Sequence, residues 1–173
     1  MKDLRYPIGE FRFTGALSDH QRAHAIHEIS VAPKMLREVV SDLSEEQIDT
    51  PYRDGGWTVR QVVHHLPDSH MNSYVRLKLA LTEEIPTIRT YEEALWAQLP
   101  DSRAPVELSL RLLEALHARW VHLLSHIEDE QWDRSFLHPD LGRMRVDELL
   151  AFYAWHGKHH IAHITSLRSR QGW

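Results

Sequence analysis

Four stretches of the chain repeat apolar residues every three or four positions, which is the spacing of one face of an α-helix. Capping residues or a proline stand at the start of three of them, at Ser18, Thr58 and Pro105. The pattern predicts helices over residues 19–43, 59–81, 105–127 and 146–168. Since no strand pattern of comparable length occurs, we expect an all-α four-helix bundle.

The connections between the predicted helices differ in length. Residues 82–104 contain two prolines and form a long crossover rather than a tight turn, with a short helix expected near residues 91–97. Residues 136–146 place turn residues between short extended pieces, which predicts a small hairpin before the last helix. Pro33 should kink the first helix, because proline removes a backbone donor.

The composition is that of one globular domain covering residues 1–173, with 42% hydrophobic and 26% charged residues. The net charge of −5 and the lack of any Lys/Arg run argue against a nucleic-acid partner. No stretch approaches the roughly 20 apolar residues of a membrane span, and residues 1–7 lack the apolar core of an export signal. We therefore expect a cytoplasmic protein without a membrane partner.

The chain contains no cysteine. Disulfides, a cysteine nucleophile and thiolate metal ligands are therefore excluded. Any metal site must use histidines and carboxylates, and any thiol that takes part in a reaction must be brought by a substrate.

Histidine is abundant, and four pairs have the i, i+4 spacing at which two imidazoles on one helix can bind one ion. Random placement of 14 histidines would give about one such pair, so the spacing alone does not identify a site. The pairs are His20/His24, His122/His126, His156/His160 and His159/His163.

A helical wheel separates these pairs by the face that each occupies. In the first helix, His20, His24 and His27 lie opposite the apolar stripe and are expected to face water. In the third helix the apolar stripe is read as Leu108, Leu112, Leu116, Trp120, Leu123 and Ile127. With this stripe, His122 and His126 lie at or beyond its margin, and His117 lies further from it around the helix.

The last helix places His156 and His160 at the centre of its apolar stripe. Burying an imidazole without partners costs on the order of 1–3 kcal/mol, so something must satisfy these two rings. Hydrogen bonds within the core are one explanation, and a bound metal is the one we favour. His159 and His163 lie close by and could support the ligands or substitute for one.

A catalytic metal site of the zinc type needs a third protein ligand and an open position. The second helix offers His64, His65 and His70, and the wheel places His70 at the centre of its apolar face and His65 at the margin. On geometry alone His70 is the choice.

Three segments resemble the YfiT branch of the DinB-like four-helix-bundle superfamily, namely residues 6–9, 51–66 and 155–164. The resemblance spans nearly the whole chain. It implies a homodimer with one divalent metal per subunit, and by motif it carries the ligand roles to His65, His156 and His160 in place of His70. Zinc is the default ion for nitrogen ligands and nickel is the alternative. Ser69 and Asn72 follow His65 on the same side and are candidates to line the pocket.

The resemblance also implies a metal-dependent hydrolase that activates water towards an unidentified small substrate. One alternative is a metal-dependent thiol S-transferase of the bacillithiol type, which joins a low-molecular-weight thiol to an electrophile. Another is a metal-binding stress protein without catalysis. Gly157 stands where a metallopeptidase HExxH motif has its glutamate, so peptidase action is not expected. Asp68 is the carboxylate nearest in sequence to a ligand, and no general base is assigned.

Overall fold

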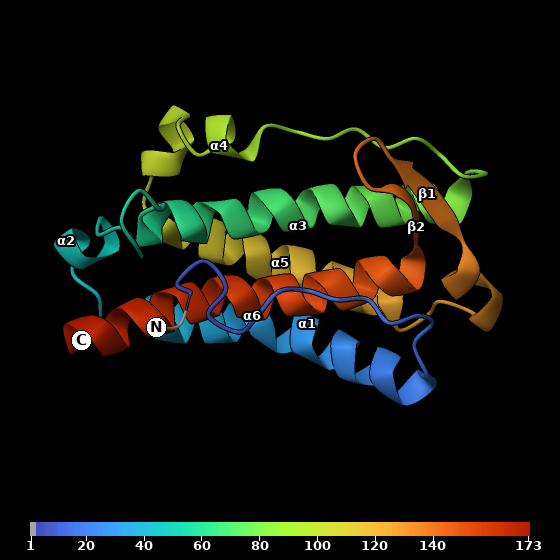
Figure 1. The fold of residues 1–173 in the computed structure, drawn as a ribbon, viewed down its shortest axis with the longest axis horizontal. Helices are drawn as coiled ribbons and strands as arrows, with labels where there is room; N and C mark the ends of the chain where they lie inside the picture. Colours follow the sequence, from blue (N-terminus) through green and yellow to red (C-terminus); the bar gives the residue numbers. More distant parts are fainter. Residues whose placement is uncertain (1–2) are drawn as a thin grey trace.

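The computed structural model describes residues 3–173 and shows four long helices packed side by side (Figure 1). They are α1 (Asp19–Val40), α3 (Val59–Thr82), α5 (Val106–Leu124) and α6 (Val146–Gln171). Their ends lie within three residues of the predicted ends, so the all-α four-helix bundle is confirmed. Residues 1 and 2 lie outside the described residues, and the single domain over 1–173 stays a prediction.

The helix starts follow the capping signals in the sequence. Ser18 with Gln21 and Thr58 with Gln61 each form a reciprocal capping box at the start of α1 and α3. Pro105 stands at the N-cap of α5 rather than at its first helical position, a shift of one residue from the prediction. Pro33 and Pro67 lie inside α1 and α3, and both helices continue through them.

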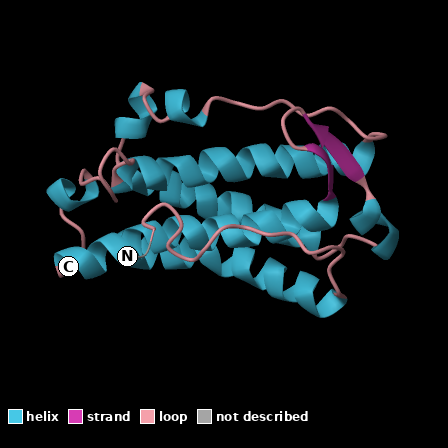
Figure 2. Cartoon of the chain, viewed as in Figure 1, coloured by secondary structure: helices cyan, strands magenta, loops and turns pink. Residues whose placement is uncertain are grey.

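Short elements fill the connections (Figure 2). Two antiparallel strands, β1 (Ser135–His138) and β2 (Gly142–Arg145), form the predicted hairpin directly before α6, in a register that pairs Phe136 with Met144. The helix expected near residues 91–97 is α4 (Glu93–Trp96). The remaining short elements are α2 (Glu45–Ile48), η1 (Pro100–Arg103) and η2 (Asp129–Asp133).

Contacts along the long helices fix their directions. α1 and α6 run parallel, because Arg22 binds Asp147 near the start of both helices and Arg168 binds Asp42 near their ends. α3 and α5 are also parallel, since the chain returns along the length of α3 through residues 83–105 before α5 begins (Figure 1). The predicted crossover is long because two parallel neighbouring helices need a connection that spans their whole length.

α3 and α6 run antiparallel. Ser69 of α3 lies beside Tyr153 of α6, whereas the earlier residue His65 lies beside the later residue His160. This register decides which side chains of the two helices meet. Among residues 3–173, none of the helices combines the length and the apolar character that a membrane crossing requires.

Two apolar clusters fill the bundle, one towards each end, and a layer of buried histidines lies between them. One cluster includes Ile29, Leu77, Trp120, Leu124, Leu150 and Tyr153. The other includes Leu36, Val62, Leu66, Leu113, Ile164 and Leu167. The layer between them contains His65, His70, His117, His156 and His160. The polar centre of the molecule is thus enclosed by packed side chains at both ends.

The buried face of α5 differs from the predicted one. Leu108 and Leu112, assigned to the apolar stripe, are 60% and 44% exposed. The helix carries a second row of apolar residues that contains a histidine, and this row is the buried one: Leu110, Leu113, His117, Trp120 and Leu124. The placement of His117 outside the stripe was therefore wrong, because the wheel followed the all-leucine row.

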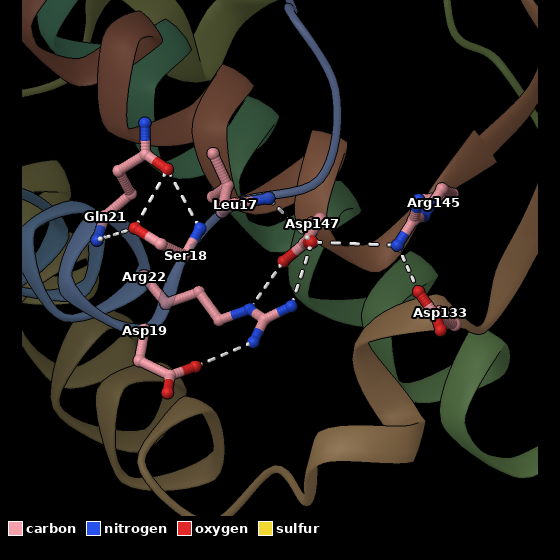
Figure 3. A network of polar contacts seen from close by, with 8 residues as sticks. All are labelled: Leu17, Ser18, Asp19, Gln21, Arg22, Asp133, Arg145 and Asp147. Atoms are coloured by element: carbon pink, nitrogen blue, oxygen red, sulfur yellow. Dashed lines mark hydrogen bonds and ion pairs between the residues drawn. The ribbon is translucent and has the colours of Figure 1, made fainter.

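Asp147, the second residue of α6, attaches the N-terminal segment to the bundle (Figure 3). Its fully buried carboxylate accepts hydrogen bonds from the Leu17 backbone N–H at 3.0 Å and from Arg22 Nε at 2.9 Å and Nη2 at 3.1 Å. Arg145 also lies beside it. The segment that precedes α1 is thereby held against the start of α6.

Candidate metal centre

Three histidines from two helices meet in the middle of the bundle. His65 comes from α3, and His156 and His160 come from successive turns of α6. One imidazole nitrogen of each lies within 4.8 Å of the corresponding nitrogens of the other two, and all three side chains are buried. The antiparallel register of α3 and α6 places His65 at the level of the α6 pair. The residues carried over by the resemblance are thus brought together.

Burial sets the protonation of these rings. Desolvation lowers the pKa of His65 to about 4. Desolvation, reinforced by the neighbouring histidines, holds the pKa of both His156 and His160 well below the usual range. All three rings are therefore neutral at pH 7, and each has a nitrogen lone pair for a cation. Three neutral imidazoles fit a zinc-type divalent ion, which then keeps its full charge.

His70 does not belong to this group of three. It is fully buried, as the wheel indicated, but it lies one layer deeper, with its Nε2 atom 3.1 Å from Nδ1 of His156. His70 therefore contacts His156 on the side away from the group of three and does not join that group, in contrast to the choice made from the helical wheel alone.

His117 of α5 extends this contact to the far side of the bundle. Its Nε2 atom lies 2.8 Å from Nδ1 of His70, and its own Nδ1 donates to the Ile29 carbonyl oxygen at 2.6 Å. Burial lowers the pKa of His117 to about 4, so this ring is also neutral. The sequence did contain a signal for the burial of His117, because it lies four residues after Leu113 and three before Trp120, on the same face of α5.

The two adjacent histidines of α3, His64 and His65, point in different directions and make different contacts. The neighbour of His65, His64, points towards the crossover, where its Nε2 donates to the Ala104 carbonyl at 2.9 Å and its Nδ1 accepts from Ser109 Oγ at 2.7 Å. One turn of α3 therefore provides a ring at the metal centre and a ring that fixes the return of the chain into α5.

The remaining α6 histidines lie towards the N-terminal segment. His163 donates from Nε2 to the Arg5 carbonyl oxygen at 3.1 Å and stacks on Tyr52 with ring centres 4.0 Å apart. His159 stacks on Trp155 with ring centres 4.4 Å apart. The histidines predicted to face water do so, namely His20, His24 and His27. His122 in the last turn of α5 and His126 just beyond the helix are also exposed.

Two cavities border the candidate centre, and His156 lines both of them. One, of about 440 Å³, lies on the side of the N-terminal segment and is lined by Tyr6, Trp57 and all three rings. The other, of about 480 Å³, extends towards the hairpin and is lined by Ser69, Arg76, Tyr91, Tyr153 and His156. Ser69 therefore lines the site as expected, whereas Asn72 lines a separate hollow beside the crossover.

Among residues 3–173, the carboxylates near this centre lie at its edge. Glu93, the first residue of α4, borders both cavities beside His156 and comes from the long crossover. Asp68 is half-buried, and desolvation together with Asp101 raises its pKa to about 6. Sequence spacing could not single out Glu93, because only the path of the crossover brings it to the site.

Comparison with known proteins agrees with this geometry. The model of the DinB superfamily matches residues 28–164, a span that includes His65, His156 and His160. The chain belongs to this superfamily. Relatives described as proposed metal-dependent hydrolases match over the full length of both chains, one from Bacillus cereus (strain AH820) with 54% identity and one from Bacillus mycoides (strain KBAB4) with 53%.

Two solved structures resemble this chain to different degrees. YfiT from Bacillus subtilis, described as a proposed metal-dependent hydrolase with an unusual four-helix-bundle topology, has a TM-score of 0.96 and 50% identity over 98% of each chain. TT2238, a four-helix-bundle protein, has a TM-score of 0.58 and 18% identity over 88% of this chain and 99% of its own, and supports the fold alone. The resemblance to the YfiT branch is thereby confirmed.

Proposed function

We propose that the protein is a metal-dependent hydrolase in which His65, His156 and His160 hold one divalent cation. The observation that carries this proposal is the convergence of three buried, neutral imidazoles from two helices with no carboxylate between them. When bound, a divalent cation supplies Lewis-acid chemistry that makes water nucleophilic near neutral pH. Zinc is the expected ion, with nickel as the alternative.

The chain's own residues supply binding and proton transfer. The substrate occupies the cavity that reaches towards the hairpin, where the hydroxyls of Ser69 and Tyr153 lie 3.5 Å apart beside His156. Glu93 accepts the proton, because its carboxylate borders the cavities on both sides of the histidines. Phe152 lines both cavities and limits access of bulk water.

A thiol S-transferase is the second candidate function, and the two cavities favour it. Both are bordered by His156, so two different substrates can approach the same centre from opposite sides. The chain has no cysteine, so the sulfur of such a reaction must come from a substrate. The candidates differ in whether water or a thiol attacks.

Metal analysis of the purified protein is the first test. We expect about one zinc or nickel ion per chain, lost in His65→Ala and kept in the matched variant His64→Gln, which alters the neighbouring ring only. Full occupancy in His65→Ala would overturn the site.

The reaction is tested on the metal-loaded protein. A panel of esters and amides is compared with a small thiol plus a model electrophile, using His65→Ala as the blank. Turnover of an ester or amide supports the hydrolase, and thiol consumption supports the transferase. Activity towards neither class, with metal bound, favours the non-catalytic metal-binding protein. The homodimer implied by the resemblance is measured on the same sample by light scattering.

A further inference from the structure

The structure assigns to His70 and His117 the task of fixing which nitrogen of His156 is free to bind a cation. These two rings and His156 form a histidine relay that crosses the bundle from α6 through α3 and α5 to the backbone of α1. Both are positioning residues, since neither reaches the centre itself.

The Ile29 carbonyl oxygen, at the α1 end of the histidine relay, determines the direction of every hydrogen bond in it. The Ile29 carbonyl oxygen can only accept, so His117 Nδ1 must carry the hydrogen, and the neutral ring then has a bare Nε2. His70 must in turn donate from Nδ1 across the 2.8 Å contact, which leaves its Nε2 bare. One backbone carbonyl thus determines the tautomer of two buried rings.

The same argument determines which nitrogen of His156 carries the hydrogen. Because the bare Nε2 of His70 accepts across 3.1 Å, His156 must donate from Nδ1. Its remaining nitrogen, Nε2, then carries a lone pair, and this atom is the one that faces Nε2 of His160 at 3.1 Å. The alternative tautomer of His156 would place a hydrogen in the metal position and a lone pair against another lone pair.

The surroundings exclude other partners for the histidine relay. His70 and His117 are 0% and 2% exposed, and they are enclosed by Trp120 and Tyr153, whose rings meet His70 edge-on. The relay makes no contact with a carboxylate in the described part of the chain. Each ring therefore holds one hydrogen, and the order of donors cannot reverse without breaking the bond to Ile29.

Glutamine provides a matched replacement for testing this assignment. At position 117 its amide N–H can donate to the Ile29 carbonyl while its amide oxygen accepts from His70, so His117→Gln keeps the direction of the histidine relay. His117→Phe keeps the volume and removes both bonds. His122→Phe changes an exposed histidine one turn further along the same helix and serves as the control.

Two measurements test the assignment. Nitrogen-15 NMR of the metal-free protein should show His156 only as the Nδ1–H tautomer in the wild type and in His117→Gln, and as a mixture in His117→Phe. A chelator competition should show a Kd for zinc raised about 10- to 100-fold in His117→Phe and restored in His117→Gln. An unchanged tautomer in His117→Phe, or no rescue by glutamine, would overturn the assignment. The NMR result is independent of whether the proposed hydrolase is correct.

A second, independent observation concerns Arg76 in the cavity that extends towards the hairpin. We propose that this arginine binds the carboxylate of an elongated substrate whose reactive end lies at the three histidines, an inference that rests on the proposed function. Its guanidinium donates from Nη2 to the Arg89 carbonyl at 3.0 Å, whereas its buried Nε has no acceptor. Within residues 3–173, no acidic side chain forms an ion pair with it.

The surroundings of Arg76 and its spacing from His65 suit such a substrate. Its acidic side chains, Glu92, Glu93 and Asp140, are exposed, whereas Arg76 is half-buried among aromatic side chains. A half-buried cation without a counter-ion is stabilised by a carboxylate, which arginine can bind through two parallel hydrogen bonds. Arg76 follows His65 by three turns of α3, so the two lie roughly 16 Å apart along the helix.

Thiol probes of two lengths test this on the cobalt-substituted protein, where thiolate binding produces an absorption band. We expect 8-mercaptooctanoate to bind about tenfold more tightly than 8-mercaptooctanol, a preference lost in Arg76→Met and kept in Arg143→Met, an exposed arginine outside the cavity. The short 3-mercaptopropionate should be insensitive to Arg76→Met. Equal binding of both long thiols would overturn the carboxylate site alone. No band with any thiol would overturn the proposed metal site and this inference with it.

Discussion

The Nε2 atoms of His156 and His160 lie 3.1 Å apart in the middle of the bundle. In the metal-free protein a hydrogen on one of these two atoms can join them, whereas a cation bound by both lone pairs replaces that hydrogen, and His65 completes the group from the facing helix. We therefore predict that His160→Ala loses the bound metal, whereas His163→Ala, three residues further along α6, keeps it. Metal content after gel filtration measures both. Loss of metal in His163→Ala alone would contradict this ligand set.

Glu93 is predicted to be the proton acceptor. Glu93→Gln should lower kcat by about 10²- to 10⁴-fold without changing metal content, because the amide cannot take up a proton. The neighbouring variant Glu92→Gln is the control, since Glu92, unlike Glu93, does not border the cavity that is lined by all three histidines. Equal activity of the two variants would remove Glu93 from the mechanism.

The stability of the metal-free protein should fall in mild acid. The pKa of His117 is about 4 in the folded state because of burial, and about 6.5 in the unfolded chain. As the pH falls below about 6.5 the unfolded chain binds a proton that the folded ring refuses, so each such histidine reduces the free energy of unfolding by up to ~1.4 kcal/mol per pH unit, down to about pH 4.

Urea unfolding at pH 7.5 and pH 5 measures this dependence. His117→Phe should show a smaller difference between the two pH values than the wild type, and His122→Phe, which changes an exposed ring, should match the wild type. A wild type that is equally stable at both pH values would contradict the neutral histidine layer.

The buried carboxylate of Asp147 is predicted to stabilise the fold. Asp147→Ala leaves the Arg22 guanidinium without its main partner and should cost about 3–5 kcal/mol. Asp42→Ala breaks the ion pair that joins the residues just after α1 to Arg168 of α6, in which the carboxylate is 65% exposed, and should cost far less than Asp147→Ala. Thermal unfolding compares the two, and equal losses would contradict the difference in burial.

Gly157 lies where α6 passes α1. A Cβ atom added there would meet Ala32 Cβ at 3.4 Å and His70 Cε1 at 3.7 Å, which are ordinary contacts. Gly157→Ala should therefore stabilise the protein by up to about 1 kcal/mol through helix propensity. Gly157→Glu, which recreates the HExxH pattern, should destabilise it by about 1–3 kcal/mol, because the longer side chain overlaps α1 and His70. A stable Gly157→Glu variant would contradict this packing.

Most of the fold could be predicted from local signals. The capping boxes at Ser18 and Thr58 gave the starts of two helices to the residue, because caps act through neighbouring atoms. The buried face of α5 could not be predicted in this way, since its leucines form two overlapping rows. The row containing His117 is buried because the Ile29 carbonyl of a distant helix satisfies the ring.

The candidate site was predictable only in part. Burial of His156 and His160 followed from the apolar stripe of α6, whereas the choice between His65 and His70 did not follow from α3. A helical wheel discards position along the axis, and the antiparallel register with α6 places His65 level with the pair and His70 one layer away. The resemblance supplied the residue that the wheel could not.

The contact between His163 and the Arg5 carbonyl has a practical consequence for how the protein is produced. Arg5 and Tyr6 line the same cavity as the three candidate ligands. An N-terminal purification tag would therefore be attached close to this cavity. A polyhistidine tag in that place would offer competing imidazoles and could load nickel from the column. Metal identity should therefore be determined on untagged protein purified without a chelating resin.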